Sequence, residues 1–265
     1  MAQVKTAGDF VWFDLLTTDP EAARDFYTQV IGWGTQLWDG IPGQPYTMWT
    51  AGETPLGGIH PLPKEATAAG APPHWLAYIS TPDVDATVAQ ATELGAELKV
   101  PPTDIPTVGR FAVLADPQGA VFAVFTPSGD SPGREGPPKI GEFSWHELAT
   151  TDHEAALGFY SALFGWEKTD AMEMGEVGIY QMYGRGGDAP LGGMFNKTAD
   201  MPGPPCWLYY AMVEDVARVA EKVKELGGQV LNGPMEVPGG DFIAQCMDPQ
   251  GAVFAIHSKA PAGGS

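Results

Sequence analysis

The sequence is poor in the residues that would direct it to nucleic acid or to a membrane. It has 14 Lys and Arg residues against 33 Asp and Glu residues, which gives a net charge of −19. A polyanion repels phosphate backbones and anionic lipid surfaces, so this charge argues against both as partners. No stretch of about 18 apolar residues occurs, and the sequence therefore predicts no membrane span.

Cysteine is equally scarce. The two cysteines, Cys206 and Cys246, cannot form a disulfide framework and lack the spacing of a zinc site, so both are expected to be small buried side chains. Residues 1–6 contain no apolar stretch of the kind found in a signal peptide. These observations predict a cytoplasmic protein.

The sequence does contain a long internal repeat. Residues 8–33 read GDFVWFDLLTTDPEAARDFYTQVIGW and residues 141–166 read GEFSWHELATTDHEAALGFYSALFGW, with more than half of the positions identical. The segment PLGG follows in both copies, and residues 116–123, DPQGAVFA, recur unchanged at 248–255. A Pro-, Gly- and Ser-rich stretch separates the copies. We therefore predict a first domain over residues 1–128, a linker over 129–139 and a second domain over 140–259.

Each copy is predicted to contain the order strand, helix and three strands twice over. In the first copy, Phe10–Thr17 has strand composition, and a capping box formed by Thr18 and Glu21 is expected to begin a helix that Gly32 ends. A second helix is predicted over Val84–Leu94, followed by strands over Glu97–Val100, Arg110–Ala115 and Ala120–Thr126. The fold class is thus α+β with four βαβββ modules, whose curved mixed sheets are expected to enclose cups suited to a ligand.

These motifs resemble those of the vicinal oxygen chelate (glyoxalase, bleomycin-resistance and extradiol dioxygenase) superfamily. The resemblance rests on the strand–TTDxEAAxxFYxxxxGW segments at 12–33 and 145–166 and on the DPxGxxF hairpins, and it covers about the whole chain. It implies two glyoxalase-like domains. It also implies a divalent metal, Zn, Ni, Fe or Mn, that binds two neighbouring oxygens of a substrate.

The ligand positions that the resemblance implies are not occupied by metal-binding residues. On the first strands they fall on Trp12 and Trp145, and on the last strands on Ala123 and Ala255. We therefore expect no metal. If one is bound, the candidate ligands are His60, His257 and Asp14, which form a His₂-carboxylate set if the first and fourth modules pair.

Three polar residues are candidates for catalysis. Asp14 and Glu147 lie two residues beyond the tryptophans and so share their face of the strand. Each is either a general base or a hydrogen-bonded residue near the strand end. His74 joins Glu147 if the second and third modules pair, and otherwise faces solvent. His146 is expected to point away from the cup.

Aromatic residues supply candidate ligand-binding surface, or else pack in the core. They are Trp12, Trp145, Tyr46, Tyr180 and Phe125, and Trp38 is a further candidate. The sequence thus predicts a protein that binds a small, partly apolar or aromatic molecule, with lyase, isomerase or dioxygenase chemistry as one hypothesis. The alternative is sequestration of the molecule without chemistry, as in the bleomycin-resistance branch. A homodimer is consistent with either.

Overall fold

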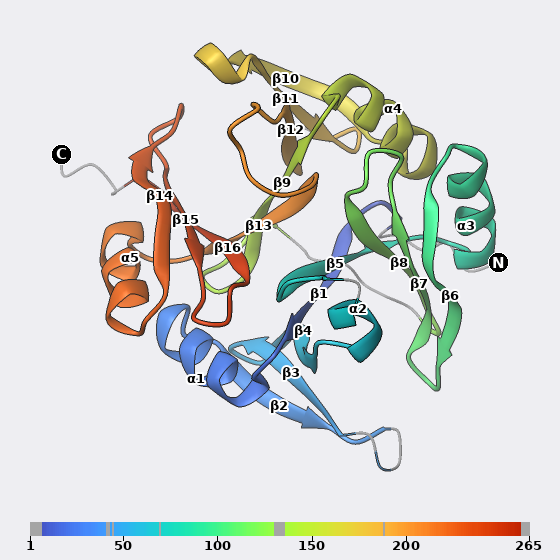
Figure 1. The fold of residues 1–265 in the computed structure, drawn as a ribbon, viewed down its shortest axis with the longest axis horizontal. Coiled ribbons are helices and arrows are strands. Elements are labelled where there is room, and N and C mark those ends of the chain that lie inside the picture. The colour runs from blue at the N-terminus through green and yellow to red at the C-terminus, as the bar shows by residue number, and fades with distance from the viewer. Residues whose placement is uncertain are drawn as a thin grey trace. The chain divides into compact units, whose positions relative to one another are not determined.

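The computed structural model describes residues 7–40, 43, 45–68, 70–129, 136–187 and 189–260. The predicted linker lies partly outside these ranges. In the described residues each repeat contains two successive βαβββ modules, which confirms the predicted fold class (Figure 1). No helix in the described ranges has the length and apolar character needed to cross a membrane.

The modules are numbered 1 to 4 along the chain. Module 1 comprises β1 (Phe10–Thr17), α1 (Pro20–Val30), β2 (Gly34–Trp38), β3 (Tyr46–Ala51) and β4 (Thr54–Pro61). After the short helix α2 (Lys64–Ala68), module 2 comprises β5 (His74–Ser80), α3 (Val84–Glu93), β6 (Glu97–Ile105), β7 (Gly109–Ala115) and β8 (Val121–Pro127).

The second repeat follows the same order. Module 3 comprises β9 (Phe143–Thr150), α4 (His153–Phe164), β10 (Glu167–Glu173), the 3-10 turn η1 (Gly175–Val177), β11 (Ile179–Gly184) and β12 (Gly192–Asn196). Module 4 comprises β13 (Cys206–Met212), α5 (Val216–Glu225), β14 (Gln229–Glu236), β15 (Phe242–Met247) and β16 (Val253–Ser258).

The strands form two eight-stranded mixed sheets, one from each repeat. Their orders are β2-β3-β4-β1-β5-β8-β7-β6 and β10-β11-β12-β9-β13-β16-β15-β14. Strand β6 continues to Ile105, beyond the predicted end at Val100, through Pro101 and Pro102. Proline is tolerated there because β6 is an edge strand, where one side of the backbone needs no ladder hydrogen bond.

Helices α1, α3, α4 and α5 begin after an N-cap aspartate, which corrects the predicted capping box. Asp19, not Thr18, is the N-cap of α1, and its carboxylate accepts a hydrogen bond from the backbone N–H of Ala22 at 3.0 Å. Asp83, Asp152 and Asp215 cap α3, α4 and α5 in the same way. A carboxylate at this position also interacts favourably with the positive end of the helix dipole.

Contacts divide the described residues into two compact units that do not follow the repeats. One unit lies within Met1–Trp12, Leu76–Glu135 and Trp145–Trp207 and contains most of modules 2 and 3. The other lies within Phe13–Trp75, Gly136–Ser144 and Leu208–Ser265 and contains most of modules 1 and 4. We call them the 2/3 unit and the 1/4 unit. Helices α3 and α4 contact each other in the first, and α1 and α5 in the second.

A buried chain of hydrogen bonds joins the two modules of the 1/4 unit. The indole N–H of Trp75 donates to the Tyr27 hydroxyl at 3.1 Å, and that hydroxyl donates to the Asp248 carboxylate at 3.1 Å. Burial raises the pKa of Asp248, and it raises that of Tyr27 well above its usual range. The aromatic ring of Phe254 packs against Tyr27 in the same core.

The 2/3 unit contains the equivalent chain. Trp207 donates to Tyr160 at 3.1 Å, and Tyr160 donates to Asp116 at 3.0 Å. The other oxygen of Asp116 accepts the N–H groups of Gln118 and Ala120 in its own turn. These contacts explain why the FY pair, the DPQG turn and the PPxWL segment recur together in the sequence.

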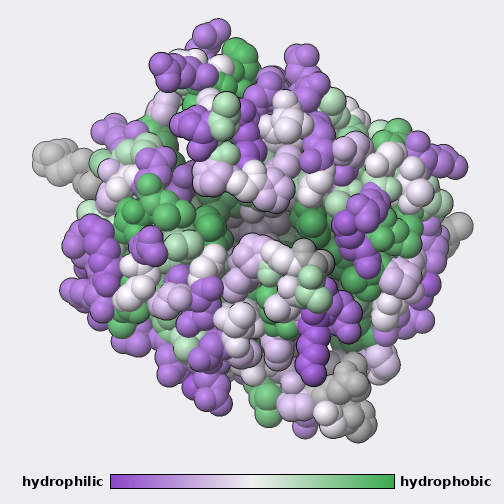
Figure 2. Space-filling model, viewed as in Figure 1, coloured by the Kyte–Doolittle hydropathy of each residue, from purple (hydrophilic) through white to green (hydrophobic). Residues whose placement is uncertain are grey.

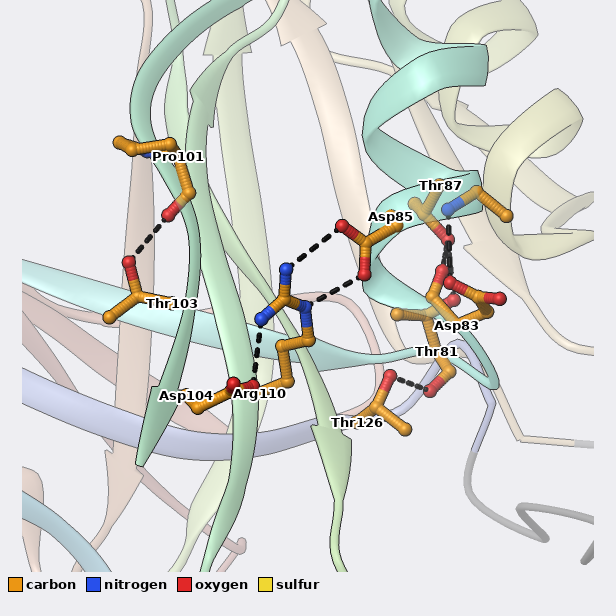
Figure 3. A network of polar contacts seen from close by, with 10 residues as sticks. Thr81, Asp83, Asp85, Thr87, Pro101, Thr103, Asp104, Arg110 and Thr126 are labelled. Atoms are coloured by element: carbon orange, nitrogen blue, oxygen red, sulfur yellow. Dashed lines mark hydrogen bonds and ion pairs between the residues drawn. The ribbon is translucent and has the colours of Figure 1, made fainter. Parts of the chain in front are cut away.

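The polar surface of the molecule reflects the charged composition of the sequence. The face drawn in Figure 2 is largely hydrophilic, with hydrophobic side chains in separate patches. Arg110 on β7 contributes a surface network, in which its guanidinium contacts Asp85 of α3 and Asp104 of β6, each at 2.7 Å (Figure 3). Such exposed pairs tie neighbouring elements together weakly, so we do not regard this network as a functional site.

Candidate functional site

The two faces of module 1 have different environments. Phe13, Gly57 and Trp49 lie side by side on β1, β4 and β3, and Trp49 contacts Tyr27 of α1. Because side chains alternate along a strand, the next row, Asp14, Gly58 and Met48, points to the opposite side. We call this side, which is opposite to helix α1, the helix-free face of module 1.

Three polar side chains meet on this face. The hydroxyl of Tyr46 donates to Asp14 Oδ1 at 2.6 Å, and Nε2 of His60 lies 3.4 Å from Asp14 Oδ2. The rings of Tyr46 and His60 stack with centroids 4.8 Å apart. The carboxylate that the sequence singled out is therefore held from both sides.

Exposure separates the roles of the three residues. The Asp14 side chain is only 5% exposed, whereas that of His60 is 46% exposed. Burial alone would lower the pKa of His60, but the hydrogen bond and the negative charge of Asp14 outweigh it and raise the pKa. The site thus combines a partly exposed imidazole with a buried carboxylate beside it. An imidazole can donate and accept protons near neutral pH.

The PLGG motif makes this geometry sterically feasible. A Cβ on Gly58 would lie 1.9 Å from the Tyr46 hydroxyl, so only glycine lets the phenol lie across β4. A Cβ on Gly57 would lie 1.7 Å from the Phe13 carbonyl oxygen. The first glycine thus allows a close approach of the two strands, and the second makes room for the tyrosine ring.

Module 3 repeats the carboxylate–tyrosine pair on the corresponding row, Glu147, Gly193 and Met182, whose side we call the helix-free face of module 3. The hydroxyl of Tyr180 donates to Glu147 Oε2 at 2.9 Å, and the indole N–H of Trp145 donates to the Tyr180 oxygen at 2.7 Å. Gly193 makes room for Tyr180, as Gly58 does for Tyr46. Glu147, Tyr180 and Trp145 were all candidates from the sequence, but their hydrogen bonds to one another were not predicted.

The two sites differ at one position. Phe195 occupies on β12 the place of His60 on β4, and its ring lies 6.0 Å from that of Tyr180. The site in module 1 is therefore Asp, Tyr and His, and the site in module 3 is Glu, Tyr, Trp and Phe. Only the first has an imidazole.

Of the other predicted residues, His74 and Phe125 lie away from these pairs, whereas Trp38 lies beside Tyr46. Nδ1 of His74 hydrogen-bonds the Pro72 carbonyl at 2.8 Å, and the residue falls in the 1/4 unit while Glu147 falls in the 2/3 unit. Phe125 pairs with Phe111 on β7 and lies against Gly109. Trp12 is half-buried on β1, and Trp38 contacts Tyr46 with centroids 6.4 Å apart.

Modules 1 and 4 do pair, but His257 does not join Asp14 and His60. Its Nδ1 lies 2.8 Å from the Ser144 hydroxyl and its Nε2 lies 3.0 Å from Asp241. Phe254 faces the shared core, so Ala255 and His257 point away from it on the module 4 side. Sequence analysis missed Ser144 and Asp241, because their contact depends on strand register.

Two further expectations concern residues outside these sites. Cys246 is buried as predicted, but Cys206 is exposed, which corrects the sequence-based expectation. Partial desolvation of the sulfur raises the pKa of Cys206, so its thiol is not activated as a nucleophile. His146 is buried against Phe10 with ring centroids 3.9 Å apart, on the helix side of β9 as expected.

The donor set on the helix-free faces does not suit a resident metal ion. Asp14 and His60 provide two donor side chains in module 1, and Glu147 provides one carboxylate in module 3. The described part of the chain contains no group of three His, Cys, Asp or Glu side chains placed to hold an ion. Catalytic metal sites commonly need three protein ligands, so we derive no step through a metal.

Comparison with known proteins identifies the family. The model of the Glyoxalase/Bleomycin resistance protein/Dioxygenase superfamily matches residues 9–124 and 140–256, and the chain belongs to this superfamily. The anthracycline biosynthesis protein DauV of Streptomyces sp. (strain C5) is 31% identical over 255 residues, which cover 92% of this chain and 91% of that protein. The CFP32 protein of Mycobacterium bovis is 41% identical over 125 residues, which cover 47% and 46% of the two chains.

Solved structures share the fold. The Mn(II)-bound glyoxalase from Novosphingobium aromaticivorans superposes with a TM-score of 0.65 at 18% identity, over 96% of this chain and 83% of that one. At this identity the likeness concerns the architecture.

Proposed function

We propose that the chain binds a planar, oxygen-bearing aromatic molecule on the helix-free faces of modules 1 and 3, and acts on it at the module 1 site. The observation that carries this proposal is the recurrence, in both repeats, of a carboxylate bonded to a tyrosine that lies over a glycine. Core packing does not require such a group, since burying a carboxylate is costly.

The chemistry of both sites suits such a ligand. The half-buried rings of Tyr46 in module 1 and Trp145 in module 3 provide aromatic surface for a flat molecule, and the tyrosine hydroxyls hold the carboxylates in place beside it. The name of the relative DauV supports the same class, because anthracyclines are polycyclic aromatics with neighbouring oxygens.

Sequestration without chemistry is the second candidate, and Phe195 favours it for module 3. With a phenylalanine where module 1 has His60, this site offers the half-buried ring of Trp145 over a buried tyrosine–carboxylate pair, but no imidazole to exchange a proton with the ligand. In that case module 1 would act on the ligand and module 3 would only bind it.

Isothermal titration calorimetry with alizarin, a dihydroxyanthraquinone with neighbouring oxygens, tests the proposal. We expect saturable binding that weakens about tenfold in Tyr46→Phe or Tyr180→Phe, the effect of losing about 1.4 kcal/mol. Arg110→Gln, in the surface network of module 2, is the matched control and should bind as the wild type does. Absence of binding, or equal binding by all variants, would refute the proposal.

A further inference from the structure

We propose that His60, oriented by Asp14, is a general base that removes the proton of a phenolic or enolic hydroxyl on the bound ligand. This inference rests on the proposed function, because it requires an aromatic ligand on the helix-free face of module 1. It adds an activity, a catalytic residue and a ligand group that the family's fold does not specify.

The contact with Asp14 sets the tautomer of His60. A carboxylate accepts hydrogen bonds, so Nε2, which lies 3.4 Å from Asp14 Oδ2, is the nitrogen that bears the proton. Nδ1 then has its lone pair available on a ring that is 46% exposed. Stacking on Tyr46 fixes the plane of that ring. A base must lie within hydrogen-bond reach of the proton it takes, so the proposal requires the ligand hydroxyl to lie against the exposed part of the His60 side chain.

Asp14 is a positioning residue. Its side chain is 5% exposed, Oδ1 accepts the Tyr46 hydroxyl and Oδ2 faces His60, so neither oxygen is presented to a ligand. The titratable groups that face His60 from β1 and β3 are Asp14 and Tyr46. When His60 takes up a proton, the imidazolium lies beside the carboxylate, which stabilises it as in other His–Asp pairs.

The step is balanced without another reactant. The O–H bond of the ligand breaks, the proton forms a bond to Nδ1 of His60, and the electron pair remains on the ligand oxygen. The products are a phenolate or enolate and an imidazolium, with no change in total charge. The exposed edge of the ring returns the proton to solvent.

The second repeat provides an internal comparison. Module 3 keeps the glycine, the tyrosine and the carboxylate, but has Phe195 in place of His60. It therefore keeps the same tyrosine–carboxylate framework and lacks the base. The substitution His60→Phe converts the first site to the pattern of the second while preserving an aromatic ring against Tyr46.

The experiment measures the ionisation of alizarin, whose monoanion absorbs at longer wavelength than its neutral form. The dye is titrated with pH in the presence of saturating protein. For the wild type we expect bound alizarin to ionise about one pH unit lower than free dye, which is about a tenfold increase in its acid constant. Asp14→Asn should lose this shift, and Asp14→Glu should restore part of it.

The shift should reverse sign in His60→Phe. Without an imidazolium, the remaining Asp14 carboxylate and the net charge of −19 disfavour the dye anion, so bound dye should ionise at higher pH than free dye. Added imidazole should return His60→Ala towards the wild-type spectrum. His257→Gln is the control, since His257 lies with Ser144 and Asp241, and it should behave as the wild type.

The outcomes separate the two proposals. No binding of alizarin by the wild type refutes the proposed function and this inference with it. Binding without the downward shift, or a downward shift that persists in His60→Phe, refutes the inference alone. Circular dichroism of each variant identifies any that fail to fold, and rescue of His60→Ala by imidazole then decides the question.

Discussion

The substitution Tyr27→Phe tests whether the buried Trp–Tyr–Asp chain holds modules 1 and 4 together. It removes one oxygen and leaves the ring among Trp33, Trp49 and Trp75. That oxygen accepts the Trp75 N–H and donates to Asp248, each at 3.1 Å. Both partners are buried, so neither regains a hydrogen bond from water when the hydroxyl is lost.

The size of the effect follows from these two bonds. One is a neutral hydrogen bond and the other involves a carboxylate, so the expected loss is about 2–4 kcal/mol in the free energy of unfolding. Urea denaturation followed by circular dichroism measures it. Tyr160→Phe, which breaks the same chain in the 2/3 unit, should cost a similar amount.

A double-mutant cycle controls for effects of the ring itself. If the Tyr27 hydroxyl acts through Asp248, then Tyr27→Phe combined with Asp248→Asn should cost less than the sum of the two single variants. A Tyr27→Phe variant within about 0.5 kcal/mol of the wild type, or a strictly additive double variant, would refute the reasoning.

Three further predictions concern Gly58, His257 and the buried Asp248. Gly58→Ala should displace Tyr46 from Asp14 and abolish alizarin binding at this site, which calorimetry would show; unchanged binding contradicts the steric argument. His257→Phe, which introduces the residue found at the equivalent position of the first repeat, should leave the alizarin spectrum unchanged, and a spectral change would implicate module 4. Burial raises the pKa of Asp248 in the folded protein, so its contribution to stability is complete below the unfolded pKa of about 3.9 and is lost as pH rises through the folded pKa. The wild type should therefore gain stability relative to Asp248→Asn as pH falls. Urea denaturation at several pH values measures this, and the opposite trend would contradict it.

The repeated pattern was sufficient to predict the modules from the sequence. Segments such as Phe10–Thr17 and Val84–Leu94 were assigned correctly because local periodicity and turn residues determine them. The differences occurred where local signals compete. Asp19 rather than Thr18 caps α1, and β6 tolerates prolines because tertiary structure places it at an edge.

The candidate site was only partly predictable for a different reason. Alternation along a strand placed Asp14 and Glu147 on one face with the tryptophans, which requires only a period of two. The partners of these residues depend on register between strands, which no local pattern specifies. Module pairing depends on still longer contacts, such as the bond from Tyr27 to Asp248 across 221 positions of the chain.

The differences between the repeats carry information that the shared motifs do not. Residues common to both, including the tyrosine, the carboxylate and the glycines, build the same surface twice. The two surfaces differ in chemistry at the residues that are present in one repeat only. The main example is His60 in the first repeat, which is Phe195 in the second. In a duplicated chain, comparison of equivalent positions in the two repeats thus helps to decide which polar groups are structural.

The most direct measurement is a crystal structure of the protein soaked with alizarin. We predict density for the flat dye over the Tyr46 ring, with one dye oxygen within hydrogen-bond distance of Nδ1 of His60. Dye seated between the helices, or ordered only at sites without a tyrosine-bound carboxylate, would contradict it.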